Sequence, residues 1–276
     1  MKIGATIFGR YYTADSVVHS MDPRAKLTIV IVYMIASVLA VDFVGVGVIA
    51  VFTLLAVLAS RIPLSEVFNS VKPLFFILIF TFLINILTVN EGTVYWQWAT
   101  FTISSGGFRH AVIFTLRVGL MLFGASLLTL TTTTLELSDG MESMMAPLAR
   151  FGFPAHEFAM MTSIALRFLP TFLDEGIKIV HAQESRGACF DEGGIVKRAK
   201  MLVPILSPLF ASAFRHAEEL SQAMESRCYH GSEGRTKVRM LKMGKADYVG
   251  FALTAVMVVL LIVTRMNVAG IVTHFA

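Results

Sequence analysis

The stretch LTIVIVYMIASVLAVDFVGVGVIAVFTLLAVLAS, residues 27–60, decides the fold class because Asp42 is its only charged side chain. Its 34 residues suffice for two helices of about 17 residues each, at the short end of what a bilayer requires. Asp42, Gly45 and Gly47 favour a turn near the middle. The stretch therefore predicts a tight pair of membrane-spanning helices.

Three further apolar segments extend this pattern. A third span is predicted at 73–89, beginning a few residues earlier, a fourth at about 111–133 and a fifth at about 248–268. Residues 90–109 predict an external loop in which VYWQWATFTIS alternates like a strand. The chain is 55% hydrophobic and 15% charged, with mean hydropathy +0.71, whereas soluble domains carry about 25% charged residues. The predicted fold is all-α, a polytopic membrane protein with about five transmembrane helices.

Residues 134–247 differ in composition from the rest. They hold 14 of the 23 Lys and Arg residues and 14 of the 19 Asp and Glu residues, yet they keep apolar positions at helical spacing. One helix is predicted to end near Gly187, and a second to begin near 210 and end near Gly231, with Pro204 and Pro208 breaking the helix before it. The predicted organisation is a four-span membrane region at 1–133, a helical region at 134–247 and a last transmembrane helix at 248–276.

The distribution of Lys and Arg predicts the orientation. With five spans, one side of the membrane carries the N-terminus, residues 134–247 and nearly all the basic residues, while the other carries only Arg109 and Arg265. The basic side is expected to be cytoplasmic. The net charge of +4 therefore reflects membrane orientation rather than nucleic-acid binding. Cys189 and Cys228 both lie in the polar region, where reduced thiols are expected.

Motifs of self-contained chemistry are missing. There is no G-x-x-x-x-G-K-[ST], and GSEGRTK at 231–237 has the wrong spacing for one. His156 and Glu157 begin a zinc motif, but position 160 is Met rather than His. No nucleophile with a partner base can be named. We therefore expect no enzyme, with no ATP site, metal or cofactor in the chain, and a membrane subunit that moves or couples something.

Two short stretches repeat the pattern Ala-x-Glu-Ser-Arg: AQESRG at 182–187 and AMESRC at 223–228. Each is predicted to be the last turn of a helix, where an arginine interacts favourably with the helix dipole. That role alone would explain both arginines. The alternative is docking, because small Ala and Ser neighbours allow close approach and a guanidinium fork bonds carboxylates or carbonyls with defined geometry. The candidate docking residues are Ala182, Ser185, Arg186, Gly187, Ala223, Ser226, Arg227 and Cys228.

At this point the chain resembles the transmembrane T component of energy-coupling factor (ECF) transporters, prokaryotic importers of vitamins and related micronutrients. The resemblance rests on MDPRAKL at 21–27, TTTT at 131–134, ALRFLPTFLDE at 165–175 and the two arginine motifs, in that order. It spans nearly the whole chain. Two departures occur: Ser precedes Arg where the family often has Ala, and Cys228 stands where Gly or Ser is usual.

The resemblance implies a role in a complex within the prokaryotic cell membrane. Two cytoplasmic ATP-binding cassette ATPases, which bind ATP and Mg, would each receive one arginine helix end. The membrane helices would hold a small substrate-binding S component, and residues 134–247 would be the coupling helices. Two alternatives stay open: a T component dedicated to cobalt or nickel uptake, and the permease of a conventional ATP-driven importer.

Other polar residues have structural expectations. Asp22, Pro23 and Arg24 favour a helix start, with Asp as cap and Pro in the first turn. Arg167 and Glu175 are predicted to form an ion pair, with Pro170 bending the chain between them. Arg117, inside the fourth span, is expected to extend to the lipid headgroups rather than contact a polar partner.

Overall fold

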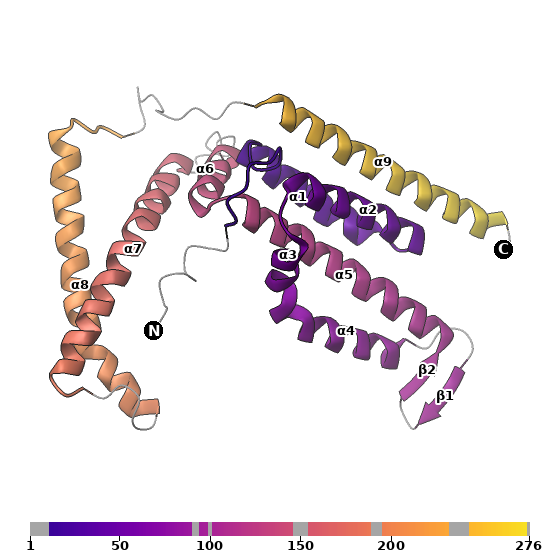
Figure 1. Ribbon diagram of the computed structural model, residues 1–276, viewed down its shortest axis with the longest axis horizontal. Coiled ribbons are helices and arrows are strands. Elements are labelled where there is room, and N and C mark those ends of the chain that lie inside the picture. Colours follow the sequence, from indigo (N-terminus) through magenta and orange to yellow (C-terminus); the bar gives the residue numbers. More distant parts are fainter. Residues whose placement is uncertain are drawn as a thin grey trace. The chain divides into compact units, whose positions relative to one another are not determined.

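The computed structural model describes residues 11–89, 94–98, 101–145, 154–188, 195–231 and 243–274. The chain forms two compact units. The first, Met1–Met144 with Met240–Ala276, is called the membrane unit below, and the second, Met145–Arg239, is called the hairpin unit. Helices dominate both, which confirms the all-α class (Figure 1).

The membrane unit contains most of the helices. In chain order they are α1 (Pro23–Leu39), α2 (Phe43–Ser60), α3 (Leu64–Val71), the 3-10 turn η1 (Lys72–Leu74), α4 (Phe75–Thr88), α5 (Ser105–Thr131), α6 (Thr134–Met145) and α9 (Lys245–His274). A two-stranded antiparallel hairpin, β1 (Val94–Trp98) and β2 (Phe101–Ser104), joins α4 to α5.

Four segments of the described chain are long and apolar enough to cross a membrane: Phe43–Ser60, Leu64–Thr88, Ser105–Thr131 and Lys245–Met266. The remaining predicted span, α1, has 17 residues. The fourth span begins at Ser105, so the prediction of a loop up to 109 was wrong. Ser104 caps α5 early, because its hydroxyl accepts the backbone N–H of Gly107 at 3.0 Å.

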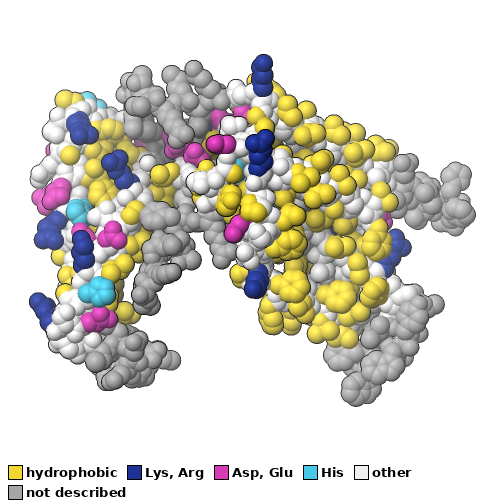
Figure 2. Space-filling model, in the orientation of Figure 1, with side chains coloured by type: hydrophobic (Ala, Val, Ile, Leu, Met, Phe, Trp, Pro, Cys, Tyr) yellow, Lys and Arg dark blue, Asp and Glu magenta, His cyan; other side chains and the backbone are white. Residues whose placement is uncertain are grey.

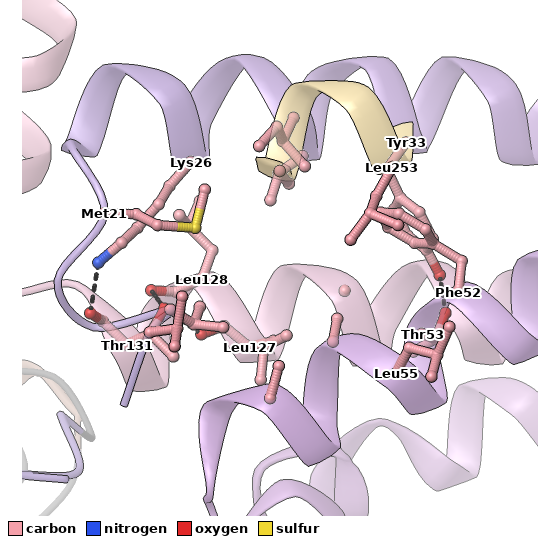
Figure 3. Close-up of a pocket in the computed structure, with 18 of the residues that line it drawn as sticks. Met21, Lys26, Tyr33, Phe52, Thr53, Leu55, Leu127, Leu128, Thr131 and Leu253 are labelled. Carbon is pink, nitrogen blue, oxygen red and sulfur yellow. Dashed lines mark hydrogen bonds between the residues drawn. The ribbon is translucent and has the colours of Figure 1, made fainter. Parts of the chain in front are cut away.

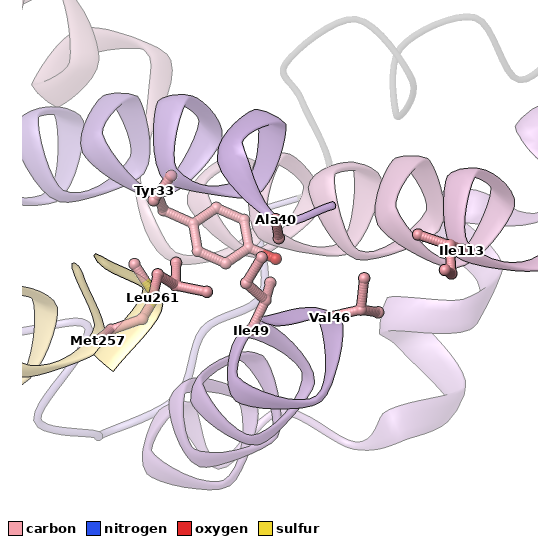
Figure 4. Close-up of a cluster of buried hydrophobic side chains, with 8 residues drawn as sticks. Tyr33, Ala40, Val46, Ile49, Ile113, Met257 and Leu261 are labelled. Carbon is pink, nitrogen blue, oxygen red and sulfur yellow. The ribbon is translucent and has the colours of Figure 1, made fainter. Parts of the chain in front are cut away.

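Tyr33 of α1 lies at the centre of the membrane-unit core. It packs with Ile49 of α2 and with Met257 and Leu261 of α9 (Figure 4). Its hydroxyl donates to the carbonyl oxygen of Leu120 in α5 at 2.7 Å and lies 2.8 Å from Thr53 Oγ1 in α2. Since no water is available deep in a bilayer, these bonds satisfy a phenol that would otherwise be costly to bury. Tyr33 thus joins three of the helices.

Arg117 also joins helices of the membrane unit. Its guanidinium donates to the backbone carbonyl oxygens of Val38 at 3.2 Å and Ala40 at 3.5 Å, where α1 ends. The ring of Phe114 lies 5.0 Å from the guanidinium carbon. The expectation that Arg117 avoids polar partners was therefore wrong, because the carbonyls at the end of a helix accept such a cation well.

A buried polar network fixes the start of α1. Asp22 is the N-cap, its carboxylate accepts the backbone N–H of Arg24 at 2.9 Å, and Pro23 occupies the first turn. Lys26 is buried and its ammonium donates to the carbonyl oxygens of His19 at 3.1 Å and Thr131 at 3.0 Å (Figure 3). The MDPRAK segment therefore fastens α1 to the end of α5.

The TTTT run has a local role at this same end. Thr133 and Glu136 form a reciprocal pair at the start of α6: the Thr133 hydroxyl accepts the N–H of Glu136, and the Glu136 carboxylate accepts the N–H of Thr133, both at 3.3 Å. This capping box satisfies two backbone donors that the helix leaves free. It lets α5 end and α6 begin within three residues.

The surfaces of the two units differ in kind. Hydrophobic side chains cover much of the visible surface of the membrane unit, whereas Lys, Arg, Asp, Glu and His side chains are spread over α7 and α8 (Figure 2). On α4, for example, Phe76 is 76% exposed. Exposed apolar surface on this scale suits a lipid environment.

The hairpin unit consists of α7 (Ala155–Ser185) and α8 (Ile195–Ser226). Pro170 lies inside α7, and Pro204 and Pro208 lie inside α8. The prediction that these two prolines end a helix was wrong: α8 continues through them and changes direction in its first part (Figure 1). It ends at Ser226, before Gly231.

Candidate docking site

The two helices of the hairpin unit run antiparallel. Gln183 near the end of α7 meets Pro204 near the start of α8, at 3.4 Å from amide nitrogen to carbonyl oxygen. Tyr229, just after α8, donates its hydroxyl to the sulfur of Met160 near the start of α7 at 3.0 Å. Residues near the end of α7 therefore contact the first part of α8, and residues near the start of α7 contact the end of α8. The two helix ends that carry the repeated motif point in opposite directions.

The Gln183 contact also explains how α8 tolerates its prolines. Pro208 has no backbone N–H, so the carbonyl four residues earlier, that of Pro204, lacks its helical donor. The side-chain amide of Gln183 donates to this carbonyl oxygen. A residue of the first Ala-x-Glu-Ser-Arg motif thereby replaces a bond that the α8 backbone cannot make.

Helix α7 ends in a Schellman motif, in which the residue after the cap adopts a left-handed conformation. Arg186 is the C-cap, and Gly187 follows with φ +89°. The N–H of Gly187 donates to the carbonyl of Glu184 at 2.9 Å, and that of Ala188 donates to Gln183 at 3.0 Å. Two carbonyls at the helix end are satisfied in this way.

Helix α8 ends in the same motif, residue for residue. Arg227 follows the last helical residue, and Cys228 adopts φ +54° where the first motif has glycine. The N–H of Cys228 donates to Glu225 at 2.9 Å, and that of Tyr229 donates to Met224 at 3.1 Å. The repeated sequence therefore corresponds to a repeated backbone structure, including at the position where the sequence departs from the family pattern.

Both motifs expose their arginines, and both serines bond back to the carbonyl of an earlier residue in their own helix. Ser185 donates its hydroxyl to the carbonyl of His181 at 2.9 Å, and Ser226 donates to Ala223 at 3.0 Å. Arg186 and Arg227 are exposed, and neither forms an ion pair or side-chain hydrogen bond with a residue that the structure describes. Ala182 and Ala223, one turn earlier, are also exposed. Each helix end thus presents one available guanidinium with small neighbours.

Cys228 provides a test of the second motif. We expect Cys228→Gly to leave the cap intact, because glycine accepts positive φ without steric cost. We expect Cys228→Val to weaken it and to raise the exchange rates of the Cys228-position and Tyr229 amides about tenfold, since a β-branched residue is strained there. Amide hydrogen exchange on the full chain measures both. Unchanged exchange in the valine variant would contradict the left-handed conformation.

Arg167 and Glu175 do not form the predicted ion pair. Both lie in the one continuous helix α7, eight residues or about 12 Å apart, and Pro170 between them does not interrupt the helix. Arg167 is exposed. Glu175 instead contacts His216 of α8, with 3.1 Å between Oε1 and Nε2. Nothing in the sequence indicated His216 as a partner, because the pairing depends on how the two helices cross.

The contact alters both pKa values in opposite directions. The hydrogen bond from His216 lowers the pKa of Glu175, and the bond to Glu175 raises the pKa of His216, with a smaller contribution from Glu219. Both groups are therefore charged, and form an ion pair, at every pH between the lowered pKa of Glu175 and the raised pKa of His216.

Nothing among the described residues offers a metal site: no group of three or more His, Cys, Asp or Glu side chains could hold an ion. The membrane unit contains an apolar cavity of about 220 Å³, lined from α1, α2, α5 and α9 by residues such as Phe52, Leu127 and Leu253 (Figure 3). Lys26 lies at one end, where its ammonium is bonded to backbone carbonyls. The cavity offers no free polar group for chemistry.

Comparisons with known proteins point to one kind of transporter. The CbiQ family, described as cobalt transport protein, matches residues 14–238, which include both arginine motifs. The energy-coupling factor transporter transmembrane protein EcfT of Ruminiclostridium cellulolyticum is 44% identical over 248 residues, 90% of this chain and 92% of that protein. The EcfT proteins of Brevibacillus brevis and Lactobacillus helveticus are each 43% identical, over 92% and 94% of this chain and 96% and 94% of their own lengths.

Proposed function

The chain belongs to the CbiQ family and is the transmembrane T component of an energy-coupling factor importer, and we propose that its hairpin unit joins two cytoplasmic ATPase subunits to a membrane-embedded S component that binds the substrate. In this proposal the chain transmits motion. ATP and Mg are bound by the ATPases, and this chain holds no cofactor of its own.

The observation that carries the proposal is the pair of matching helix ends. Arg186 and Arg227 occupy the same position of the same Schellman motif, and both are exposed. The helix ends that carry them lie at opposite ends of the antiparallel hairpin. An arginine that only balanced its own helix dipole would need no such equivalence. Two equivalent cationic ends suit two related partners, each offering carboxylates or carbonyls to a guanidinium.

Exposed apolar residues on α8 support the S component as the other partner. Val203, Leu206, Phe210 and Phe214 recur every three or four residues, so they share one face of the helix. All four are exposed, Phe214 to 75%. An apolar stripe of this kind on a charged hairpin needs cover, and a small hydrophobic membrane protein would provide it.

The proposed orientation follows from the same arrangement. ATPases that use cellular ATP lie in the cytoplasm, so the hairpin unit and the N-terminus would face that side. The excess of Lys and Arg in 134–247 supports this orientation.

The test is a mild-detergent pull-down of the tagged chain from its native membrane. We expect two ATPases and at least one small hydrophobic protein to co-purify. Phe210→Ser with Phe214→Ser should remove the small protein and leave the ATPases bound. In the proposal, these two aromatic side chains bury apolar area only against the small protein. Arg186→Ala with Arg227→Ala should give the reverse pattern and so serves as the control. Loss of both partners in the phenylalanine variant would contradict separate surfaces.

A cobalt-dedicated T component is the second candidate, because the matching family is described as cobalt transport protein. The same pull-down decides between the two. One dedicated set of metal-uptake partners favours the cobalt version, whereas several different small hydrophobic proteins favour a shared T component.

A further inference from the structure

Glu175 and His216 occupy equivalent places in the two coupling helices. Glu175 lies 11 residues before Arg186, and His216 lies 11 residues before Arg227. At the helical rise, each separation is about 16 Å. Because α7 and α8 are antiparallel, the two segments extend from this contact in opposite directions. The Glu175–His216 contact therefore lies midway between the two arginine ends.

The contact is built to hold one crossing geometry. His216 Nε2 lies 3.1 Å from Glu175 Oε1, and its Nδ1 lies 3.5 Å from Glu219 Oε2. The rings of Phe168 and Phe172 from α7 pack on the imidazole, with centroids 5.8 and 5.9 Å away. Both ring nitrogens and both ring neighbours thus constrain His216.

The Glu175 carboxylate depends chiefly on this partner, because the hydrogen bond from His216 lowers its pKa more than the one from Ser212 does. Its other oxygen, Oε2, is shielded from solvent and has no hydrogen-bond partner among the described residues. The side chains of Glu175 and His216 are only about a quarter exposed, at 27% and 28%. A partly buried carboxylate without a cation is unfavourable, so opening the contact would cost more than an exposed pair would.

We propose that Glu175 and His216 form a clasp that positions Arg186 and Arg227, fixing the crossing of α7 and α8 so that movement at one arginine end reaches the other through arms of equal length. This inference rests on the proposed function of the arginines. In this proposal Glu175 and His216 are positioning residues, which act through the crossing of the two helices.

The charge on the clasp gives it a pH dependence. The titratable groups that face His216 are Glu175 from α7 and Glu219 from α8, and Arg215 from α8 acts on the Glu175 carboxylate. Since the pKa of His216 is raised, its contribution is complete below its ordinary value of about 6.5 and is lost as the pH rises through the raised value. Since the pKa of Glu175 is lowered, its contribution is complete above its ordinary value and is lost only as the pH falls through the lowered one.

The experiment measures the crossing in the complete complex. Spin labels at Lys178→Cys and Gln222→Cys, in a cysteine-free chain assembled with its partners in lipid vesicles, report the distance across the two arms. The clasped population should fall as the pH rises above about 6.5 and through the raised pKa of His216. Glu175→Gln should lower the ratio of clasped to open hairpins about tenfold at low pH, the effect of one charge-assisted hydrogen bond. It should also move the midpoint of the pH transition downwards.

Two further variants keep the proposal open to refutation. His216→Lys retains a cation at all of these pH values, so its clasped population should persist at pH 9. Glu218→Gln removes a charge from an exposed neighbouring position and should leave the midpoint unchanged. A transition that is the same in wild type, Glu175→Gln and His216→Lys would overturn the clasp.

The outcome for the clasp is separable from that for the proposed function. If Arg186→Ala with Arg227→Ala detaches the ATPases while clasp variants show normal crossing, the docking role stands and the clasp is wrong. If the arginine variant keeps its ATPases, both are wrong. Retained ATPases in Glu175→Gln together with an altered crossing are the result that supports the clasp.

Discussion

Replacing both Arg186 and Arg227 with alanine is expected to release the ATPase subunits and abolish transport. Each guanidinium is exposed at a helix end and is available to a partner. An arginine that fills a partner groove contributes about 2 kcal/mol or more to binding, which corresponds to roughly thirtyfold in affinity. The affinity lost with both contacts is therefore larger than the rest of the interface is expected to compensate. The measurement is ATPase co-purification alongside ATP-driven uptake in vesicles.

Each single alanine substitution should weaken ATPase binding by less than half of the effect of the double substitution. If the two ATPases associate with each other, the chain holds them at two points, and one intact point keeps the other close. Double lysine variants should recover little, because lysine keeps the charge but lacks the planar fork. Arg167→Ala, an exposed arginine in the middle of α7, is the matched control and should bind normally. Normal uptake by the double alanine variant would exclude the docking role.

The sequence predicted the helix ends of the hairpin unit because their signals are local. Helical spacing of apolar residues and the glycine at 187 mark the end of α7. The equivalence of the second end was harder to predict, since Cys228 adopts a positive φ that non-glycine residues seldom adopt. Only the shared Ala-x-Glu-Ser-Arg pattern indicated it.

The errors of prediction arose where distant contacts override local rules. Pro204 and Pro208 indicated a break, but Gln183 from the other helix satisfies a carbonyl that the second proline leaves free. Arg117 indicated a side chain extended to headgroups, but the carbonyls that end α1 lie within its reach. His216 has no neighbour in sequence that predicts its bond to Glu175. None of these partners can be read from spacing along one helix.

The second large effect is expected from Asp247→Ala, which should destabilise the membrane unit. One carboxylate of Asp247 serves the starts of two helices. Its Oδ1 accepts the backbone N–H of Asp22, the N-cap of α1, at 2.8 Å, and its Oδ2 accepts that of Gly244, just before α9, at 2.7 Å. Asp247 is 1% exposed. It thereby ties together segments 225 residues apart in the sequence.

Alanine at this position would leave two N–H groups without an acceptor and would remove a negative charge from beside buried Lys26, whose ammonium it helps to neutralise. Breaking a buried charged arrangement by removing one member costs about 3–5 kcal/mol. Asp247→Asn should destabilise the unit less than alanine does, but still measurably. Its amide nitrogen, which can only donate, would face one of the two backbone N–H donors. Unfolding in mixed detergent micelles, followed by circular dichroism, measures the difference.

Asp42→Ala is the matched control for this prediction. Asp42 also precedes a helix, α2, but its side chain makes no capping hydrogen bond. Its replacement should therefore change the free energy of unfolding by less than about 1 kcal/mol. Both substitutions remove one aspartate at a helix start, but only Asp247 is buried between two helix starts. Equal losses in the two variants would show that the shared carboxylate does not hold α1 and α9 together.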